Sequence, residues 1–269
     1  VNGVIASATN MELVLSYTLK KFTSFAQTSS GICLAVPSNL TAVEQRAFFN
    51  VLSGRINASK VRLVDKGIAD AVSIGLPVLA SQGHMVVNIG ADTTEISVIS
   101  GGNVILGQTL KLGGRKLDED IITMIRRKFN INIGQRTAEQ LKNNLAFMIN
   151  GPRLEQKIFG IHMLSGLPKS DMIPSLAVSV AIIDTVDQII ENIRAVYDRI
   201  PPVVRKDIEA EGIFLTGGVS MILNLPIYIQ KEIGLPIYHI QDPKNSTLRG
   251  LIEIINNKEL KGLTRLPRL

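Results

Sequence analysis

Short apolar runs alternate with amphipathic helical segments along the first part of this sequence. Residues Ile32–Val36 form an apolar run that Pro37 ends, and Thr41–Glu44 then carries the Thr and Glu of a capping box at the start of a helix. The next apolar run, Val61–Val64, is followed by a short helical pattern over Ile68–Ile74. This order predicts a parallel sheet covered by helices, because parallel strands need a crossover connection between them.

A second group of strands follows, connected by turns instead of helices. Met85–Ile89, Glu95–Ser100 and Val104–Leu112 are separated by glycine-containing turns, which predicts three neighbouring strands. We expect Ile213–Leu215 to join the same sheet, and a long helix, Val178–Arg199, to end at Pro201–Pro202. The apolar stripe of this helix is expected to pack against the sheet, and it consists of Val180, Ile183, Val186, Ile190, Ile193 and Tyr197. The chain is therefore predicted to be an α/β protein whose two units share a cleft.

The segment between these elements has a weaker pattern. Apolar residues at i, i+4 spacing from Leu117 to Phe129 predict an amphipathic helix. Thr137–Gln140 has the composition of a second capping box. Residues 143–174 are mixed, with glycines, prolines and short apolar runs, and predict no single element.

Composition excludes several classes of protein. Hydrophobic residues make up 45% of the 269 residues, which excludes a disordered chain, and no run of about 18 apolar residues suggests a transmembrane helix. Aromatic residues are only 4%, without tryptophan, and the net charge of +6 is mild for this length, so nucleic acid is not an expected partner. With one cysteine, Cys33, and three histidines without ligand spacing, we expect neither a disulfide nor a metal site made of these residues.

Two glycine turns are the candidate phosphate-binding elements. One is the strand–turn–strand segment around Gly90–Thr94, and the other is the strand–turn–helix segment Thr216–Ser220. Glycines at strand ends let backbone amides approach a phosphate, and a following helix N-terminus favours an anion. Either turn alone is more typical of an ordinary loop, but together, on an α/β frame, they predict a phosphate site.

Several ordered segments of the chain resemble one known family. The matching segments are Gly3–Ala6, Ser38–Ala47, Gly75–Pro77, Met85–Ser100, Gly134–Lys142, Ser165–Pro168, Pro201–Pro202 and Gly212–Gly218. On these residues the sequence resembles the bacterial actin homologues of the MreB/Mbl family, in the actin–Hsp70–hexokinase superfamily. The resemblance covers nearly the whole chain.

The resemblance implies an actin-like, ribonuclease-H-like α/β fold with two lobes around a nucleotide cleft. Lobe I would comprise residues 1–75 and 244–269, and lobe II residues 76–243, with a small inserted subdomain at about 113–174. The family's first phosphate loop, and the small subdomain of lobe I after it, are expected before Val1 and are not in this sequence. The expected protein is therefore a truncated or degenerate member.

The resemblance also implies ATP and magnesium as ligands and assigns positions to them. The phosphate hairpin falls on Asn88–Glu95, with Gly90, Ala91, Asp92 and a retained family threonine, Thr93, in its turn. The positions on the adenosine side are Glu139, Gln140, Lys142, Thr216, Gly217, Gly218, Val219 and Ser220.

Six residues depart from the family pattern. Asn88 stands where the family has an Asp that organises magnesium, and Lys66 stands where it has the Glu that orients the attacking water. Magnesium prefers anionic oxygens, and an ammonium has no lone pair to accept a proton from water. Ala91 and Asp92 replace glycines near the phosphates, Val219 replaces a glycine, and Asn144 replaces an acidic residue. Together they predict loss of ATP hydrolysis, no metal site, and nucleotide binding that is weak or absent.

Lys66 and Asp92 replace residues that the family directs at one magnesium–phosphate centre. We therefore expect the two charges on facing walls of the cleft, as an ion pair, formed directly or through water, that holds the lobes together in place of the ligand. The alternative is two independent solvated charges.

The leading hypothesis for function is an actin-like, cell-shape-determining cytoskeletal protein that acts through protein–protein assembly without ATP turnover. One alternative is a fragment of a competent ATP-dependent MreB-type filament protein, and another is a sugar-kinase-like enzyme of the same superfamily, for which no sugar-site signature is visible. The expected partners are copies of itself or another actin-like subunit, together with membrane proteins of cell elongation. The expected location is the cytoplasm, including the inner face of the membrane, with weakly supported peripheral membrane contact.

Overall fold

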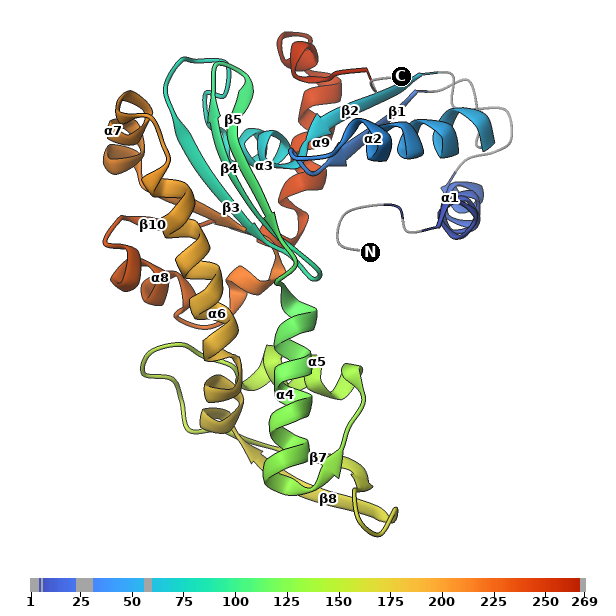
Figure 1. Cartoon of the computed structure of the whole chain (residues 1–269), viewed down its shortest axis with the longest axis vertical. Helices are drawn as coiled ribbons and strands as arrows, with labels where there is room; N and C mark the ends of the chain where they lie inside the picture. Colours follow the sequence, from blue (N-terminus) through green and yellow to red (C-terminus); the bar gives the residue numbers. More distant parts are fainter. Residues whose placement is uncertain (1–4, 6, 23–30, 56–59, 267–269) are drawn as a thin grey trace.

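The computed structural model describes residues 5, 7–22, 31–55 and 60–266, and within them the strands form three sheets (Figure 1). Of the first segment of the family resemblance, Gly3–Ala6, only Ile5 lies among the described residues. Strands β1 (Ile32–Val36) and β2 (Val61–Asp65) pair in parallel, with Ile32 opposite Val61. The predicted parallel strand pair is confirmed.

Helices surround this parallel pair. They are α1 (Ala8–Phe22), α2 (Ala42–Phe49), a π-helical turn (Asn50–Arg55), α3 (Lys66–Ile74), α9 (Ser246–Asn256) and a 3₁₀ turn (Glu259–Leu263). The predicted capping box at the start of α2 is confirmed, because the Thr41 hydroxyl accepts a hydrogen bond from the Glu44 amide and the Glu44 carboxylate accepts one from the Thr41 amide.

A mixed sheet of five strands forms the centre of the described structure. Its strands, in spatial order, are β10 (Ile237–His239), β9 (Ile213–Thr216), β3 (His84–Ile89), β4 (Thr94–Ser100) and β5 (Asn103–Leu110). Strand β9 runs parallel to β3, with Leu215 opposite Val87, and β4 and β5 continue as antiparallel hairpins. The predicted meander and the predicted place of Ile213–Leu215 beside it are both confirmed.

Helix α6 (Ser175–Asp198) crosses one face of this sheet (Figure 1). The predicted stripe is only partly right. Val186, Ile190 and Ile193 are buried, whereas Val180 is exposed. The reason is that the first half of α6 extends beyond the sheet and packs against α4 and α5, so its buried positions there are set by those helices.

A smaller unit lies below the central sheet in Figure 1. It contains α4 (Gly114–Phe129), α5 (Gln135–Leu145) and an antiparallel sheet of β6 (Ile131–Asn132), β7 (Glu155–His162) and β8 (Pro168–Pro174). The predicted capping box at Thr137 is wrong, because α5 begins earlier, at Gln135, with Gly134 as its N-cap. The β7–β8 hairpin lies in the segment for which no element was predicted, and its strands bury few side chains.

The remaining helical elements follow α6. They are α7 (Pro202–Glu211), a 3₁₀ turn (Gly218–Met221), α8 (Leu225–Ile233) and a 3₁₀ turn (Pro243–Asn245). Pro201–Pro202 ends the long helix as predicted, and Pro202 also begins α7, because proline at the first helical position loses no hydrogen bond.

The side chains of the β3–β4 hairpin are buried on both faces of the central sheet. On one face Val87 and Ile96 pack with α4, α5 and α6, and on the other Val86 and Ile99 pack with α3 and α9. The turn between β3 and β4 therefore lies where elements from both faces and from the lower unit meet. Within the described ranges, no helix combines the length and apolar character needed to cross a membrane.

Candidate functional site

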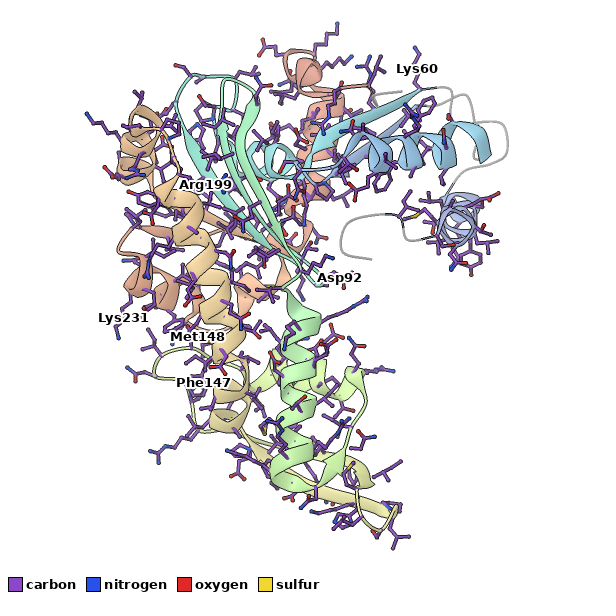
Figure 2. All side chains as sticks on the ribbon, in the orientation of Figure 1. Lys60, Asp92, Phe147, Met148, Arg199 and Lys231 are labelled. Atoms are coloured by element: carbon purple, nitrogen blue, oxygen red, sulfur yellow. The ribbon has the colours of Figure 1, made fainter. Side chains whose placement is uncertain are left out.

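The turn between β3 and β4 is held against the beginning of α4. The Gly90 amide donates to the Thr93 carbonyl at 2.9 Å, which closes the turn. The Gly90 and Ala91 carbonyls accept hydrogen bonds from the amides of Gly114 and Arg115, at 2.9 and 2.7 Å. Figure 2 shows Asp92 beside the start of α4. The amides of Ala91 and Asp92 make no hydrogen bond to the described part of the chain, so both remain available to an anion.

Lys66 lies beneath this turn. It is the first residue of α3, and its Nζ donates to Asn88 Oδ1 at 2.9 Å. A Cβ atom on Gly90 would lie 3.8 Å from the same Nζ, so the ammonium is close to the phosphate hairpin predicted from the sequence. A cation at a helix N-terminus is disfavoured by the helix dipole. The Asn88 carbonyl and nearby carboxylates offset that cost here.

Asp70, which was not among the predicted site residues, is the buried anion behind Asn88. Its side chain has no exposed surface, and described residues on three elements donate to it. Oδ2 accepts from Asn88 Nδ2 at 2.7 Å and from Thr216 Oγ1 at 3.3 Å. Oδ1 accepts from Ser246 Oγ at 2.8 Å and from Thr247 Oγ1 at 2.7 Å. The network therefore ties α3 to β3, β9 and the start of α9.

The direct form of the ion pair predicted between Lys66 and Asp92 is wrong. Lys66 bonds to Asn88, and Asp92 Oδ1 instead pairs with Arg115 Nε at 2.9 Å. The reason is geometric: Lys66 lies under the base of the turn, whereas Asp92 is in the turn itself, next to the first residues of α4. Since the side chains of Arg115 and Asp92 are 61% and 31% exposed, their pair is a surface contact.

Glu95 is the carboxyl group that connects β4 to the end of β1. It is buried, and its Oε1 accepts a hydrogen bond from the Ser38 amide at 3.1 Å. Burial raises its pKa to about 7, although the charge of Lys66 acts in the opposite direction. Near neutral pH this group is therefore shared between its protonated and ionised forms.

Of the predicted adenosine-side residues on α5, Lys142 is buried and the other two are exposed. Lys142 Nζ pairs with Asp118 at 2.8 Å and donates to the Gly114 carbonyl at 3.0 Å. Burial raises the pKa of Asp118, and the ammonium of Lys142 acts against that shift. Glu139 and Gln140 remain on the surface.

The second glycine turn contacts the first one closely. Gly217 has φ of +84°, and a Cβ atom on it would lie 2.3 Å from the Ile89 carbonyl oxygen. Val219 belongs to the core, and the Ser220 hydroxyl donates to the Gly217 carbonyl at 2.7 Å. A Cβ atom on Gly114 would lie 3.1 Å from Lys142 Nζ and 3.3 Å from Val219 Cγ2. The structure thus brings the hairpin, Lys142 and the Thr216–Gly218 turn together around the start of α4, with Gly218 beside Lys244.

The residues under the hairpin do not fit the magnesium ion that the family resemblance implies. Magnesium requires hard oxygen ligands in octahedral geometry. Asn88 Oδ1 already accepts from Lys66, both oxygens of Asp70 accept from four donors among the described residues, and Oδ1 of Asp92 pairs with Arg115. A divalent ion 4 Å from the Lys66 ammonium would meet a repulsion of about 8 kcal/mol at an effective dielectric of 20. No cluster of His, Cys, Asp or Glu with metal-binding geometry occurs in the described ranges.

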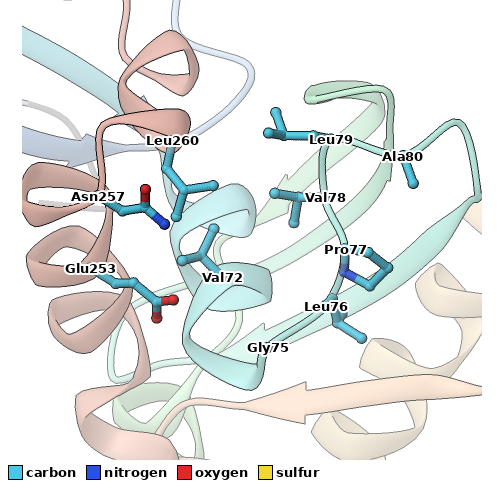
Figure 3. A pocket seen from close by; sticks show the side chains of 10 residues that line it. All are labelled: Val72, Gly75, Leu76, Pro77, Val78, Leu79, Ala80, Glu253, Asn257 and Leu260. Carbon is cyan, nitrogen blue, oxygen red and sulfur yellow. The ribbon is translucent and has the colours of Figure 1, made fainter.

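A separate hollow of about 220 Å³ opens on the other end of α3 (Figure 3). Figure 3 shows Val72 between Leu76 and the residues at or just beyond the end of α9 that also line the hollow, which are Glu253, Asn257 and Leu260. No residue of the β3–β4 turn lines it, so it is not the phosphate site.

Comparison with known proteins identifies the family. The family model described as MreB/Mbl protein matches residues 1–262. The chain belongs to the MreB/Mbl family. Among curated relatives, the cell shape-determining protein MreB of Haemophilus influenzae is 32% identical over 266 residues, which are 97% of this chain and 76% of the relative. The cell shape-determining protein Mbl of Bacillus subtilis is 30% identical over 262 residues, 96% of this chain and 78% of Mbl.

Solved structures confirm the actin-like fold of this MreB/Mbl chain. The crystal structure of MreB5 of Spiroplasma citri bound to AMPPNP has a TM-score of 0.91 and 28% identity, covering 98% of this chain and 79% of that one. The MamK double helical filament has a TM-score of 0.77 at 18% identity, covering 95% of this chain and 79% of that one. The family match favours the filament branch of the superfamily over the sugar-kinase alternative.

Proposed function

We propose that this chain is a subunit of an actin-like filament that acts in determining cell shape, and that it does not hydrolyse ATP. Membership of the MreB/Mbl family and the names of the relatives support the first part. One observation carries the second part: Lys66, in the position that resembles the water-orienting glutamate, is hydrogen-bonded to Asn88.

The chemistry of these two side chains argues against turnover. Orienting or deprotonating an attacking water requires a hydrogen-bond acceptor, and the ammonium of Lys66 has none. Asn88, in the position that resembles the magnesium-organising aspartate, uses its oxygen to hold Lys66 and its amide group to bond to Asp70. Neither residue is free to support an in-line attack on a phosphate.

Nucleotide binding and assembly follow from the same arrangement. The MreB5 structures of Spiroplasma citri contain AMPPNP and ADP. For this chain we propose that ATP binds more weakly than the micromolar range and that assembly does not depend on it. The two lobes would be residues 1–75 with 244–269 and residues 76–243. The partners would be further copies or another actin-like subunit, with membrane proteins of cell elongation at the inner face of the membrane.

The test combines phosphate release with sedimentation of polymer. We expect no phosphate release from ATP in magnesium buffer above a protein-free control, and the same amount of pelleted protein with ATP, with ADP or without nucleotide. Thr93→Ala is the matched control for contaminating activity, because release that originates in this site must change when the turn threonine is removed. Magnesium-dependent release that Thr93→Ala abolishes would show a competent ATPase, and failure to pellet under any condition would contradict self-assembly.

A further inference from the structure

We infer that the ammonium of Lys66 is the resident cation of this site and that it binds the polyphosphate of a nucleotide without a divalent metal. The inference deepens the proposed function and rests on its assignment of a nucleotide to the cleft. The reason is that Asn88 Oδ1 and both oxygens of Asp70, which lie under the hairpin where a magnesium ion would need ligands, already accept hydrogen bonds.

The position of Lys66 favours contact with a phosphate in the turn. Its Nζ lies under Gly90, at 3.8 Å from where a Cβ atom would be, and the side chain is only partly buried. Within the described part of the chain, Asn88 Oδ1 is the single hydrogen-bond acceptor of this ammonium. Since an ammonium carries three donors, two remain for another acceptor.

Two further donors lie in the turn. The amides of Ala91 and Asp92 make no hydrogen bond to described residues, and successive amides of this kind form an anion-binding concavity. The Asp92 carboxylate would oppose an anion, but the guanidinium of Arg115 lies against it at 2.9 Å. The local charge that a polyphosphate meets is therefore set by Lys66.

The network behind Lys66 explains why the lysine stays in place. Asn88 is fixed in one orientation, because its Nδ2 donates to Asp70 at 2.7 Å while its Oδ1 accepts from Lys66 at 2.9 Å. Asp70 in turn receives the hydroxyl groups of Thr216, Ser246 and Thr247. The negative charge of Asp70 is thus on α3, where donors saturate it, and β3 presents the neutral amide of Asn88, which positions a cation.

The experiment measures ATP binding by isothermal titration of the full chain, with either excess magnesium chloride or excess EDTA in the buffer. We expect the same dissociation constant in both buffers. Lys66→Met should weaken binding by about tenfold or more, because it removes the charge-assisted hydrogen bonds to phosphate, and Lys66→Arg should retain most of the affinity. Lys206→Met, which removes the same charge from the exposed surface of α7, should leave binding unchanged.

Three results would overturn the inference: binding that requires magnesium, binding in neither buffer, or unchanged affinity of Lys66→Met. The comparison of the two buffers uses the unmodified chain, so it stands even if a Lys66 variant fails to fold. Sedimentation of the same samples separates this inference from the proposed function, because polymer that forms without measurable ATP binding would contradict the inference alone.

Discussion

The two glycine turns of this protein lie against each other but differ in what their residues do. At the second turn, Gly217 has a left-handed backbone, and a side chain there would meet the Ile89 carbonyl at 2.3 Å. At the first turn, Ala91 and Asp92 carry side chains, and the carbonyls of Gly90 and Ala91 accept hydrogen bonds from the first amides of α4. The second turn therefore depends on a glycine for its backbone packing, whereas the first turn accommodates side chains at Ala91 and Asp92.

Beneath the turns, the residues that hold the elements together also differ from those that face a ligand. The hydrogen bonds that hold β3, β9, α3 and α9 together converge on Asp70 and are saturated. Beside this network, Asn88 presents an amide and Lys66 an ammonium under the first turn. The actin-like fold is therefore present together with a neutral group and a cation at the positions that we propose correspond to the metal-organising and water-orienting residues.

The strongest test of this comparison is Gly217→Ala. A Cβ atom 2.3 Å from a backbone oxygen cannot be relieved by a side-chain rotation, and φ of +84° adds backbone strain. We expect a loss of about 4 kcal/mol or more in the free energy of unfolding, or failure to fold. Gly234→Ala is the matched control: φ there is +80°, but no atom lies within 4 Å of the new Cβ, so the cost should be about 1 kcal/mol. Urea unfolding measures both, and equal losses would contradict the role of the Ile89 contact.

The second-largest loss of stability is expected from substitution of Asp70. Asp70→Ala leaves four donors of the described residues without their acceptor in a buried place, and we expect a loss of about 3 kcal/mol in the free energy of unfolding. Asp184→Ala removes an exposed carboxylate from α6 and should change it by less than about 0.5 kcal/mol. If the two variants were equally stable, the hydrogen bonds to Asp70 would not hold the elements together.

The third prediction uses pH. The pKa of Glu95 is about 7 in the folded protein against an ordinary value of 4.5, so between these values the folded state binds more protons than the unfolded state. Stability should therefore fall as pH rises through this window and level off above it, by about 3 kcal/mol from this group. Glu95→Gln retains an acceptor for the Ser38 amide but cannot ionise. In urea titrations at several pH values, the free energy of unfolding of Glu95→Gln should therefore increase relative to that of the unmodified chain as pH rises. A difference that stays constant with pH would contradict the raised pKa of Glu95.

The smallest effect is expected at the tip of the first turn. Asp92→Asn removes the surface ion pair with Arg115, and since both side chains are partly exposed, the free energy of unfolding should change by less than about 0.5 kcal/mol. Thermal unfolding of the two proteins measures it. A loss comparable to that of Asp70→Ala would mean that the first turn, too, is held by its side chains.

Much of the fold could be predicted because its signals are local. The apolar runs of β3, β4 and β9 are buried on both faces, so their composition marks them as strands wherever they pack. The β7–β8 hairpin was not predicted, because its strands expose apolar residues such as Phe159 and bury few others. The capping-box pattern placed the N-cap of α5 at Thr137. In the structure Gly134 is the N-cap, so the helix begins three residues earlier than predicted.

The sequence by itself determined the strand order of the central hairpins and the place of both glycine turns, and it drew attention to Lys66 and Asn88. Only the tertiary structure decided how these charges pair. Asp70 lies 18 residues from Asn88 and 176 from Ser246, so no local pattern relates them, and they meet only because α3, β3 and α9 pack at one end of the sheet. The partner of a charged side chain depends on distances of a few ångströms between separate elements, whereas a strand or a turn depends on its own residues.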